Sequence, residues 1–297
     1  MVQEKIIGRF APSPSGPLHF GSLACALASY LDAKVRGGQW LVRMEDLDPP
    51  REIKGASQHI LNQLEAHSLC WDGQVLYQSQ RLDAYAEVIL SLEEAQLAYH
   101  CQCNRKRITE LSGLYDNHCR TLDLDGQNNA TRLALLHQID IISFDDEFIG
   151  HVSQSLRSTV GDFIIKRRDD LFSYQLAVTV DDAFQAVTRV VRGSDLLNST
   201  PRQIYLQQCL GYKQPSYAHV PIAVTSDGKK LSKQNLATGL PAGNESSNLC
   251  VALDWLQQCP PHKLSSLPTA EIISWAIQNW DQNKLPTNLT VPAPKGF

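Results

Sequence analysis

Apolar and polar residues alternate along the first hundred positions in a way that predicts strands and helices in turn. Residues 6–10 form a short apolar run, ended by Pro12 and Pro14, that is typical of a buried strand. A helical pattern follows over 21–36, and Gly37-Gly38 ends it. The next predicted elements are a strand over 39–45 and helices over about 54–69 and 81–98. This order favours an α/β nucleotide-binding domain of the Rossmann type, with a parallel sheet.

The middle of the chain has a different pattern, with clustered Cys and His residues and few long periodic runs. We interpret it as an insertion into the α/β domain. Beyond it, the patterns predict strands at 162–166, 172–178, 187–192 and 219–225, and helices near 200–210, 247–258 and 268–280. The expected division is a first half of the Rossmann-type domain over 1–98, the insertion over 99–158, the second half over 159–240, and a short helical region over 241–297.

Composition narrows the class of protein. A chain of 297 residues with 43% hydrophobic content can bury one large core or two modest ones. It has no run of 18 apolar residues, so no membrane span is expected, and its start shows no apolar signal region. Eight unevenly spaced cysteines then suit a reducing cytoplasm better than a disulfide framework. The net charge of −4 means that any nucleic-acid contact needs a local basic face.

The first motif with chemical content is Arg9-Phe-Ala-Pro-Ser-Pro-Ser-Gly-Pro-Leu-His-Phe-Gly-Ser22. It places a Pro-, Ser- and Gly-rich turn between a predicted strand and the N-terminus of the 21–36 helix. Such a helix end is an anion site, and His19 could donate to a phosphate oxygen there. The alternative is a turn in which His19 only caps the helix or packs. The motif is neither a dinucleotide fingerprint nor a P-loop.

The second motif is Gly228-Lys-Lys-Leu-Ser-Lys233. A loop with several lysines can close over a triphosphate and neutralise charge on departing pyrophosphate. Alone, it would more often be a solvated basic loop. Together the two motifs describe an enzyme that holds ATP phosphates from two sides while a carboxylate attacks the α-phosphate.

These motifs resemble those of class I aminoacyl-tRNA synthetases. The HIGH element corresponds to His19-Phe-Gly-Ser22 and the KMSKS element to Lys230-Leu-Ser-Lys-Gln234, with departures at the last position of each. Further matches are typical of the glutamyl branch and extend over roughly 5–240: they are Arg9 to Gly16, Arg43 to Asp46, Tyr174 to Ala177, Val180 to Asp182, and Val190 to Gly193. The glutaminyl branch usually has Pro-Pro-Glu-Pro-Asn where this chain has Ala11-Pro-Ser-Pro-Ser15.

The resemblance implies a role for each matching residue. The glutamate pocket would contain Arg9, Ala11, Ser13, Glu45, Tyr174 and Arg192, with Glu45 holding the substrate ammonium. ATP would be bound by His19, Gly21, Ser22, Lys230 and Lys233, of which His19 and Lys233 would be the catalytic pair, with Mg²⁺ on the phosphates. Independently, an amino acid with two carboxylates needs at least two cations and one anion. The alternatives are surface ion pairs for Arg9 and Arg192 and an ordinary acidic turn at Glu45-Asp46.

The chain ends 64 residues after Lys233. Full-length glutamyl enzymes add anticodon-binding domains there, and a domain needs about 50–250 residues, so we expect that part to be absent. Such a shortened enzyme, with Asp48-Pro-Pro-Arg51, resembles the glutamyl-queuosine tRNA(Asp) synthetase family. That resemblance implies glutamate transfer to queuosine at the wobble position, with the anticodon stem-loop of tRNA(Asp) as partner and a monomer favoured. The rivals are a short synthetase charging a tRNA 3′ end and a non-catalytic paralogue.

Cysteine spacing adds a metal site to these expectations. Two thiolates in Cys101-x-Cys103 and a third at Cys119 suit structural Zn²⁺, which takes four tetrahedral ligands. The residues alone leave the fourth ligand open among His100, His118 and Tyr115, and the family resemblance implies Tyr115. The alternative is three ordinary thiols.

Overall fold

The computed structural model describes residues 5–225, 227–231 and 239–297. Its first ninety-odd residues alternate strand and helix as their pattern predicts. The elements are β1 (Ile7–Phe10), α1 (Phe20–Val35), β2 (Gln39–Met44), α2 (Ala56–Ala66), β3 (Leu76–Tyr77) and α3 (Leu82–Glu94). The middle of the chain forms β4 (Ala98–Cys101), α4 (Arg105–Glu110), β5 (Ala130–Leu133), β6 (Ile141–Asp146), β7 (Gly150–Ser155), α5 (Leu156–Thr159) and β8 (Phe163–Lys166).

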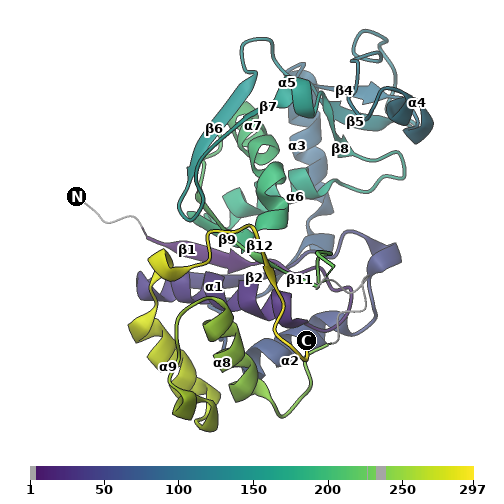
Figure 1. Cartoon of the computed structure of the whole chain (residues 1–297). Coiled ribbons are helices and arrows are strands. Elements are labelled where there is room, and N and C mark those ends of the chain that lie inside the picture. The colour runs from purple at the N-terminus through teal and green to yellow at the C-terminus, as the bar shows by residue number, and fades with distance from the viewer. Residues whose placement is uncertain (1–4, 226, 232–238) are drawn as a thin grey trace.

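The remaining elements return the chain to the α/β region. They are α6 (Tyr174–Phe184), β9 (Arg189–Gly193), α7 (Thr200–Leu210), β10 (Ser216–Val220), β11 (Ile222–Val224), α8 (Glu245–Trp255), α9 (Thr269–Asn279) and β12 (Thr290–Pro292). Figure 1 shows β4, α4, β5 and β8 together in the upper part of the molecule, with α8 and α9 below β1 and α1. None of the described helices combines the length and the apolar character that crossing a membrane requires.

Two sheets meet at the centre of the fold. One has the order β1-β2-β3 and the other β7-β6-β10-β9, and the pairs within them are parallel except β6–β7. The backbone N–H of Thr188 donates to the carbonyl of Ile7 at 3.0 Å, which places β9 beside β1. Strands 181 residues apart in sequence are thus neighbours. The predicted α/β architecture with a parallel sheet is confirmed, and a separate antiparallel sheet, β4-β5-β8, forms beside it.

Helix α1 is the centre of the larger hydrophobic core. Eleven of its residues are buried, and several are alanines whose small side chains let the helix lie close to the strands. The helix ends at its C-cap Arg36, because Gly37 adopts a left-handed φ of 65°. A Cβ on Gly38 would lie 2.7 Å from the carbonyl oxygen of Ile6, so glycine is required there as well. The side chains of α8 and α9 cover the other side of α1 and belong to the same core. The N-terminus of α1 is therefore held rigidly.

One predicted strand is wrong. Alternating apolar residues predicted a strand over 172–178, but α6 begins at Tyr174, and only Phe172 makes an isolated bridge. The hydroxyl of Ser173 accepts the backbone N–H of Leu176 at 3.3 Å and so caps the helix. Leu176 and Val180, four residues apart, are both buried in the second core. Burial on a helical period therefore overrides the strand preference of the local β-branched residues.

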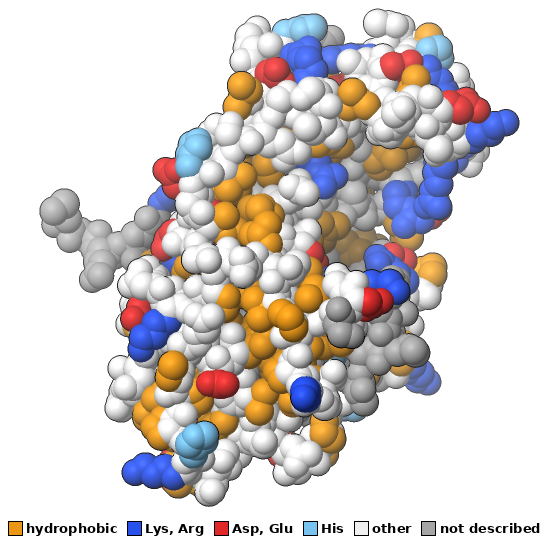
Figure 2. All heavy atoms as spheres, in the orientation of Figure 1, with side chains coloured by type: hydrophobic (Ala, Val, Ile, Leu, Met, Phe, Trp, Pro, Cys, Tyr) orange, Lys and Arg blue, Asp and Glu red, His pale blue; other side chains and the backbone are white. Residues whose placement is uncertain are grey.

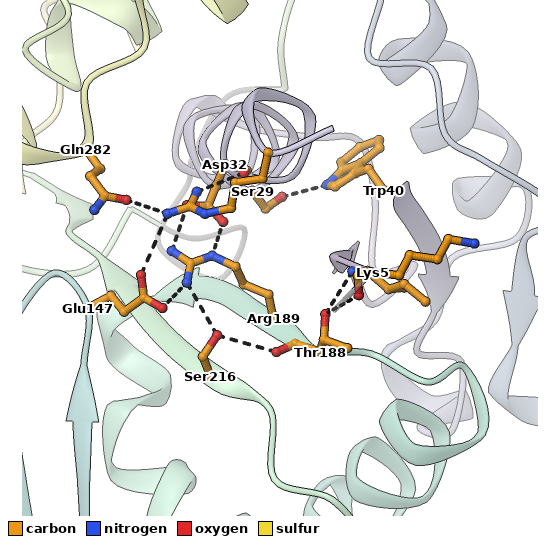
Figure 3. A network of polar contacts seen from close by, with 11 residues as sticks. Lys5, Ser29, Asp32, Trp40, Glu147, Thr188, Arg189, Ser216 and Gln282 are labelled. Carbon is orange, nitrogen blue, oxygen red and sulfur yellow. Dashed lines mark hydrogen bonds and ion pairs between the residues drawn. The ribbon is translucent and has the colours of Figure 1, made fainter. Parts of the chain in front are cut away.

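A buried polar network joins α1 to the second half of the chain (Figure 3). Arg189 donates to both carboxylate oxygens of Asp32, once at 2.8 Å, and also contacts Glu147. Arg36 bonds Asp32 at 2.6 Å and Gln282 at 2.7 Å. Arg189 and Asp32 have side chains 4% and 1% exposed, so their charges are tolerated there only because each is paired, Arg189 with Asp32 and Glu147, and Asp32 also with Arg36.

Removing the Arg189 guanidinium should therefore destabilise the fold. We expect R189M to lower the free energy of unfolding by about 3 kcal/mol, because Asp32 and Glu147 lose their buried partner. Urea denaturation followed by circular dichroism measures this. The matched control is R167M, because Arg167 pairs with Asp169 at the surface and should change stability by less than about 1 kcal/mol. Equal losses in the two variants would contradict the expectation.

Candidate active site

A cavity of about 670 Å³ opens at the carboxyl ends of β1, β2 and β9. Ligands of open α/β sheets bind at this edge. Its lining includes these residues from the two motif regions and the matched segments: Arg9, Ala11, Ser13, His19, Gly21, Ser22, Glu45, Tyr174, Arg192 and Lys230. Figure 2 shows the molecule hollowed between its upper and lower parts, with Lys and Arg side chains along the upper side of the hollow.

A buried cluster of two arginines around one carboxylate lies next to the cavity, and one of its members, Arg9, belongs to the cavity lining. Arg9 on β1 donates to both oxygens of Asp182, from Nε at 3.2 Å and from Nη2 at 3.3 Å. Arg43 on β2 donates to the same carboxylate at 2.7 Å and to Gln185 at 2.8 Å. Although burial opposes ionisation, the two guanidinium groups keep the pKa of Asp182 below its usual range. Arg9 is therefore held in place by Asp182, whose negative charge compensates the charge of the guanidinium group.

Glu45 lies directly after β2 at the wall of the cavity. Its backbone N–H donates to the carbonyl of Pro12 at 3.0 Å, which ties the wall to the Pro-rich turn. Its side chain is 11% exposed and lies 3.9 Å from Arg43. Burial raises the pKa of Glu45 to about 7, although Arg43 and Arg9 favour its charged form. A cationic group entering the cavity would relieve this cost by pairing with the carboxylate.

Arg192 and Tyr174 form another side of the same cavity. The Nη1 atom of Arg192, at the end of β9, donates to the Tyr174 hydroxyl at 3.3 Å. The Arg192 residue is only 3% exposed, yet it lines the cavity. Two cations, Arg9 and Arg192, and one anion, Glu45, thus surround a single space. This is the charge pattern expected for an amino acid that carries two carboxylates and one ammonium.

The N-terminus of α1 supplies the anion-binding side. The backbone N–H of Ser22 donates to Nδ1 of His19 at 3.3 Å, so His19 is the N-cap, and the neutral ring carries its proton on Nε2. A Cβ on Gly21 would lie 3.3 Å from the His19 ring and 3.6 Å from Ala223, so glycine permits this close approach. His19 thus caps the helix, as the alternative expected, and it also lines the cavity.

Of the two lysines expected to bind ATP, one is described. Lys230 lines the cavity and forms an ion pair with Asp195 at 2.6 Å. Lys233 lies outside the described residues. Sequence reasoning missed Asp195 and Asp182, although the first lies three residues after Arg192 and the second belongs to a matched motif. Spacing alone could not reveal them, because their partners are more than 30 residues away in the chain.

The cysteine cluster begins at Cys101, the last residue of β4, and none of its members lines the cavity. The sulfur atoms of Cys101, Cys103 and Cys119 lie within 4.8 Å of one another, and those of Cys103 and Cys119 are 3.5 Å apart. The Tyr115 hydroxyl is 3.5 Å from the Cys101 sulfur. Among the described ligand-type side chains, neither His100 nor His118 joins this group. Three sulfurs and one phenol oxygen therefore converge.

Comparisons with known proteins identify the family. The profile described as "tRNA synthetases class I (E and Q), catalytic domain" matches residues 5–242. A glutamate tRNA ligase from Elizabethkingia meningosepticum has the same fold, with a TM-score of 0.77 and 24% identity over 96% of this chain and 66% of its own. The chain belongs to the class I tRNA synthetases of the E and Q type.

Its similar relatives within that class share one name. "Glutamyl-Q tRNA(Asp) synthetase" from Pseudomonas aeruginosa PAO1 is 49% identical over 96% of this chain and 97% of its own. The protein of that name from Escherichia coli K12 is 48% identical over 98% and 94%. Such identity over nearly whole chains places this chain in the same family as the glutamyl-Q tRNA(Asp) synthetases.

The raised pKa of Glu45 predicts a pH dependence of stability. The folded state binds the proton of Glu45 more tightly than an unfolded chain, whose carboxyl has a pKa near 4.5. The contribution of this residue to stability is therefore greatest below pH 4.5 and falls as the pH rises through 7. We expect E45Q to gain on the order of 1–3 kcal/mol over the wild type between pH 5 and 8. Urea denaturation at each pH measures it.

The matched control for E45Q is E65Q, because Glu65 is exposed on α2. Its stability difference from the wild type should stay constant across this pH range. A difference between E45Q and the wild type that does not change with pH would contradict the expectation.

Proposed function

We propose that this protein activates L-glutamate with ATP to form glutamyl-adenylate and transfers the glutamyl group to queuosine at the wobble position of tRNA(Asp). The observation that carries the proposal is the cavity. Arg9, Arg192 and Glu45 surround one part of it, and the α1 N-terminus with Lys230 borders another. One space can therefore hold a dicarboxylic amino acid next to a polyphosphate.

Activation needs orientation and charge neutralisation, and no catalytic base. The α-carboxylate of glutamate is ionised at neutral pH, and it attacks the α-phosphorus of ATP directly. A new C–O–P bond forms while the bond to pyrophosphate breaks. The α1 N-terminus, the Nε2 proton of His19 and the Lys230 ammonium group would stabilise the phosphate charge, together with Lys233 of the same motif. Mg²⁺ would enter with the ATP phosphates.

Glutamate would be held by the charges on the opposite side of the cavity. Glu45 would take the ammonium group, and Arg9 and Arg192 would take the carboxylates, with the Tyr174 hydroxyl beside Arg192. Ala11 and Ser13, from the Pro-rich turn, would close the wall around the side chain. In the second step a hydroxyl of the queuosine diol attacks the activated carbonyl carbon. An ester forms, and AMP and one proton leave.

The names of the relatives favour queuosine over the tRNA 3′ end as acceptor. We propose that the anticodon stem-loop of tRNA(Asp) is the partner and that a monomer binds it. Lys and Arg side chains border the hollow in Figure 2, and such cations support a contact with RNA phosphates. Retention of Arg9, His19, Glu45 and Arg192 around one cavity argues against a non-catalytic paralogue.

Structural zinc fits the cysteine cluster. Three Zn–S bonds of about 2.3 Å in a tetrahedron separate the sulfurs by about 3.8 Å, close to the spacing observed. The hydrogen bonds of Tyr115 and of Arg132 lower the pKa of the Cys101 thiol despite its burial. Burial and the thiols raise the pKa of Tyr115, so a divalent cation would have to ionise it as fourth ligand. Zinc would order this part of the chain.

The acceptor test uses tRNA(Asp) without its terminal adenosine, prepared with and without queuosine. With ATP and labelled glutamate, we expect label only on the queuosine-containing form, because the ribose diol of the 3′ end is missing. Acid-precipitable radioactivity measures the transfer, and K233A should abolish it while glutamate binding, followed by calorimetry, persists. Label absent from both shortened forms but present on intact tRNA lacking queuosine would identify an ordinary charging enzyme. No label on any tRNA would indicate a non-catalytic protein.

Metal analysis tests the zinc proposal. We expect about one zinc per purified wild-type chain by inductively coupled plasma mass spectrometry, and a loss of most of it in C103S, because three ligands hold Zn²⁺ weakly. Y115F should bind zinc more weakly than the wild type in competition with a chelator. The control is C70S, which alters an exposed cysteine outside the cluster. Wild-type zinc retention in Y115F would exclude the phenol as ligand.

A further inference from the structure

We propose that Asp146 and His219 are positioning residues that hold Arg192 in the orientation needed to bind glutamate. This inference rests on the proposed function and deepens it. Neither residue lines the cavity. Both side chains are fully buried behind Arg192, Asp146 at the end of β6 and His219 on β10.

Every nitrogen of the Arg192 guanidinium has a fixed acceptor. Its Nε donates to Nε2 of His219 at 3.1 Å, and its Nη2 donates to the hydroxyl of Thr200 at 2.7 Å. Its Nη1 donates to Tyr174 in the cavity wall at 3.3 Å. Because three different atoms are bound in three directions, the plane of the guanidinium fork cannot rotate. The fork has one geometry to offer a carboxylate.

The contact with Arg192 dictates the proton position on His219. A guanidinium nitrogen can only donate, so Nε2 of His219 must be the acceptor, and the ring proton must be on Nδ1. That proton is donated to Oδ2 of Asp146 at 2.6 Å. Asp146 therefore selects the tautomer of His219 that can accept from Arg192. An orienting carboxylate has the same effect on histidine in other enzymes.

Asp146 is itself fixed by its backbone surroundings. Its other oxygen, Oδ1, accepts the backbone N–H groups of Phe148 and Ile149 at 3.1 Å and that of His219 at 3.2 Å. All of these partners are donors, so both carboxylate oxygens must act as acceptors. The parallel pairing of β6 with β10, where Asp146 is opposite Tyr217, brings the carboxylate to this place. The end of β6 is thus connected to Arg192 in the cavity lining through the side chains of Asp146 and His219.

The substitution D146N tests the chain of donors and acceptors at nearly constant volume. If the amide oxygen keeps the three backbone N–H groups, the amide nitrogen faces Nδ1 of His219 and forces it to accept. The ring proton then moves to Nε2 and opposes the Nε–H of Arg192. The reverse orientation places the amide nitrogen against three backbone donors. Either way Arg192 loses its Nε contact with His219, which is one of the three contacts that fix its orientation.

We expect D146N and H219L to raise the KM for glutamate by about 10-fold or more in glutamate-dependent ATP–pyrophosphate exchange, measured with and without tRNA(Asp). The KM for ATP should change less than about 2-fold, because the α1 side of the cavity is untouched. H219Q should restore much of the glutamate affinity, because its amide oxygen can accept from Arg192. N248L is the control: Asn248 on α8 is buried, bonds His67 and does not line the cavity. It should lose stability with both KM values unchanged.

Two results would overturn this inference and leave the proposed function standing. An active wild type with an unchanged glutamate KM in D146N and H219L would remove the positioning role. Parallel changes of both KM values in D146N, H219L, H219Q and N248L, following their urea midpoints, would assign the pair a purely structural role. A wild type without glutamate-dependent exchange, with or without tRNA, would instead refute the proposed function, and the inference with it.

Discussion

The buried carboxylate of Asp182 is the interaction on which the active-site side of the molecule depends. It is carried by α6 and holds Arg9 of β1 and Arg43 of β2, which come from the other half of the chain. All three residues are almost completely buried. Loss of Asp182 would leave Arg9 without the carboxylate that binds it and Arg43 with only Glu45, 3.9 Å away. The same contacts hold Arg9 at the cavity and Arg43 next to Glu45. The ion pairs that stabilise the fold therefore also position the charged residues of the site.

The cavity combines groups that are unfavourable without a ligand. Glu45 has a pKa raised by burial, and Arg192 has little solvent around its charge. Each group would be better solvated at the surface, and each becomes useful when a substrate of opposite charge enters. Because the nucleophile is the carboxylate of the substrate itself, the protein contributes orientation and electrostatics instead of proton transfer. This explains why the arginine side chains at the cavity, Arg9 and Arg192, are each held by two or more hydrogen bonds.

Local patterns predicted the elements well where packing agrees with them. The helix over 21–36 appears as Phe20–Val35, because its apolar positions, its N-cap and its terminal glycines all indicate the same structure. The stretch 172–178 failed, because β-branched and alternating residues indicated a strand while Ser173 capped a helix that buries Leu176 and Val180. The residues of the two motifs and the cysteine cluster were visible from spacing. Asp182, Asp195, Asp146 and His219 were not, because their partners are distant in sequence.

By itself, the sequence determined the class of chemistry, because each group lies in a short motif that can be recognised locally: the helix N-terminus, the lysines, the pocket charges and the thiolates. Only the tertiary structure decided which charges meet. A backbone hydrogen bond from Thr188 to Ile7 places β9 beside β1, and parallel pairing places β6 beside β10. Arg9 and Arg192 therefore line one cavity, and Asp146 reaches His219. Strand pairing depends on the packing of the whole core, and no local pattern encodes which residues it will bring together.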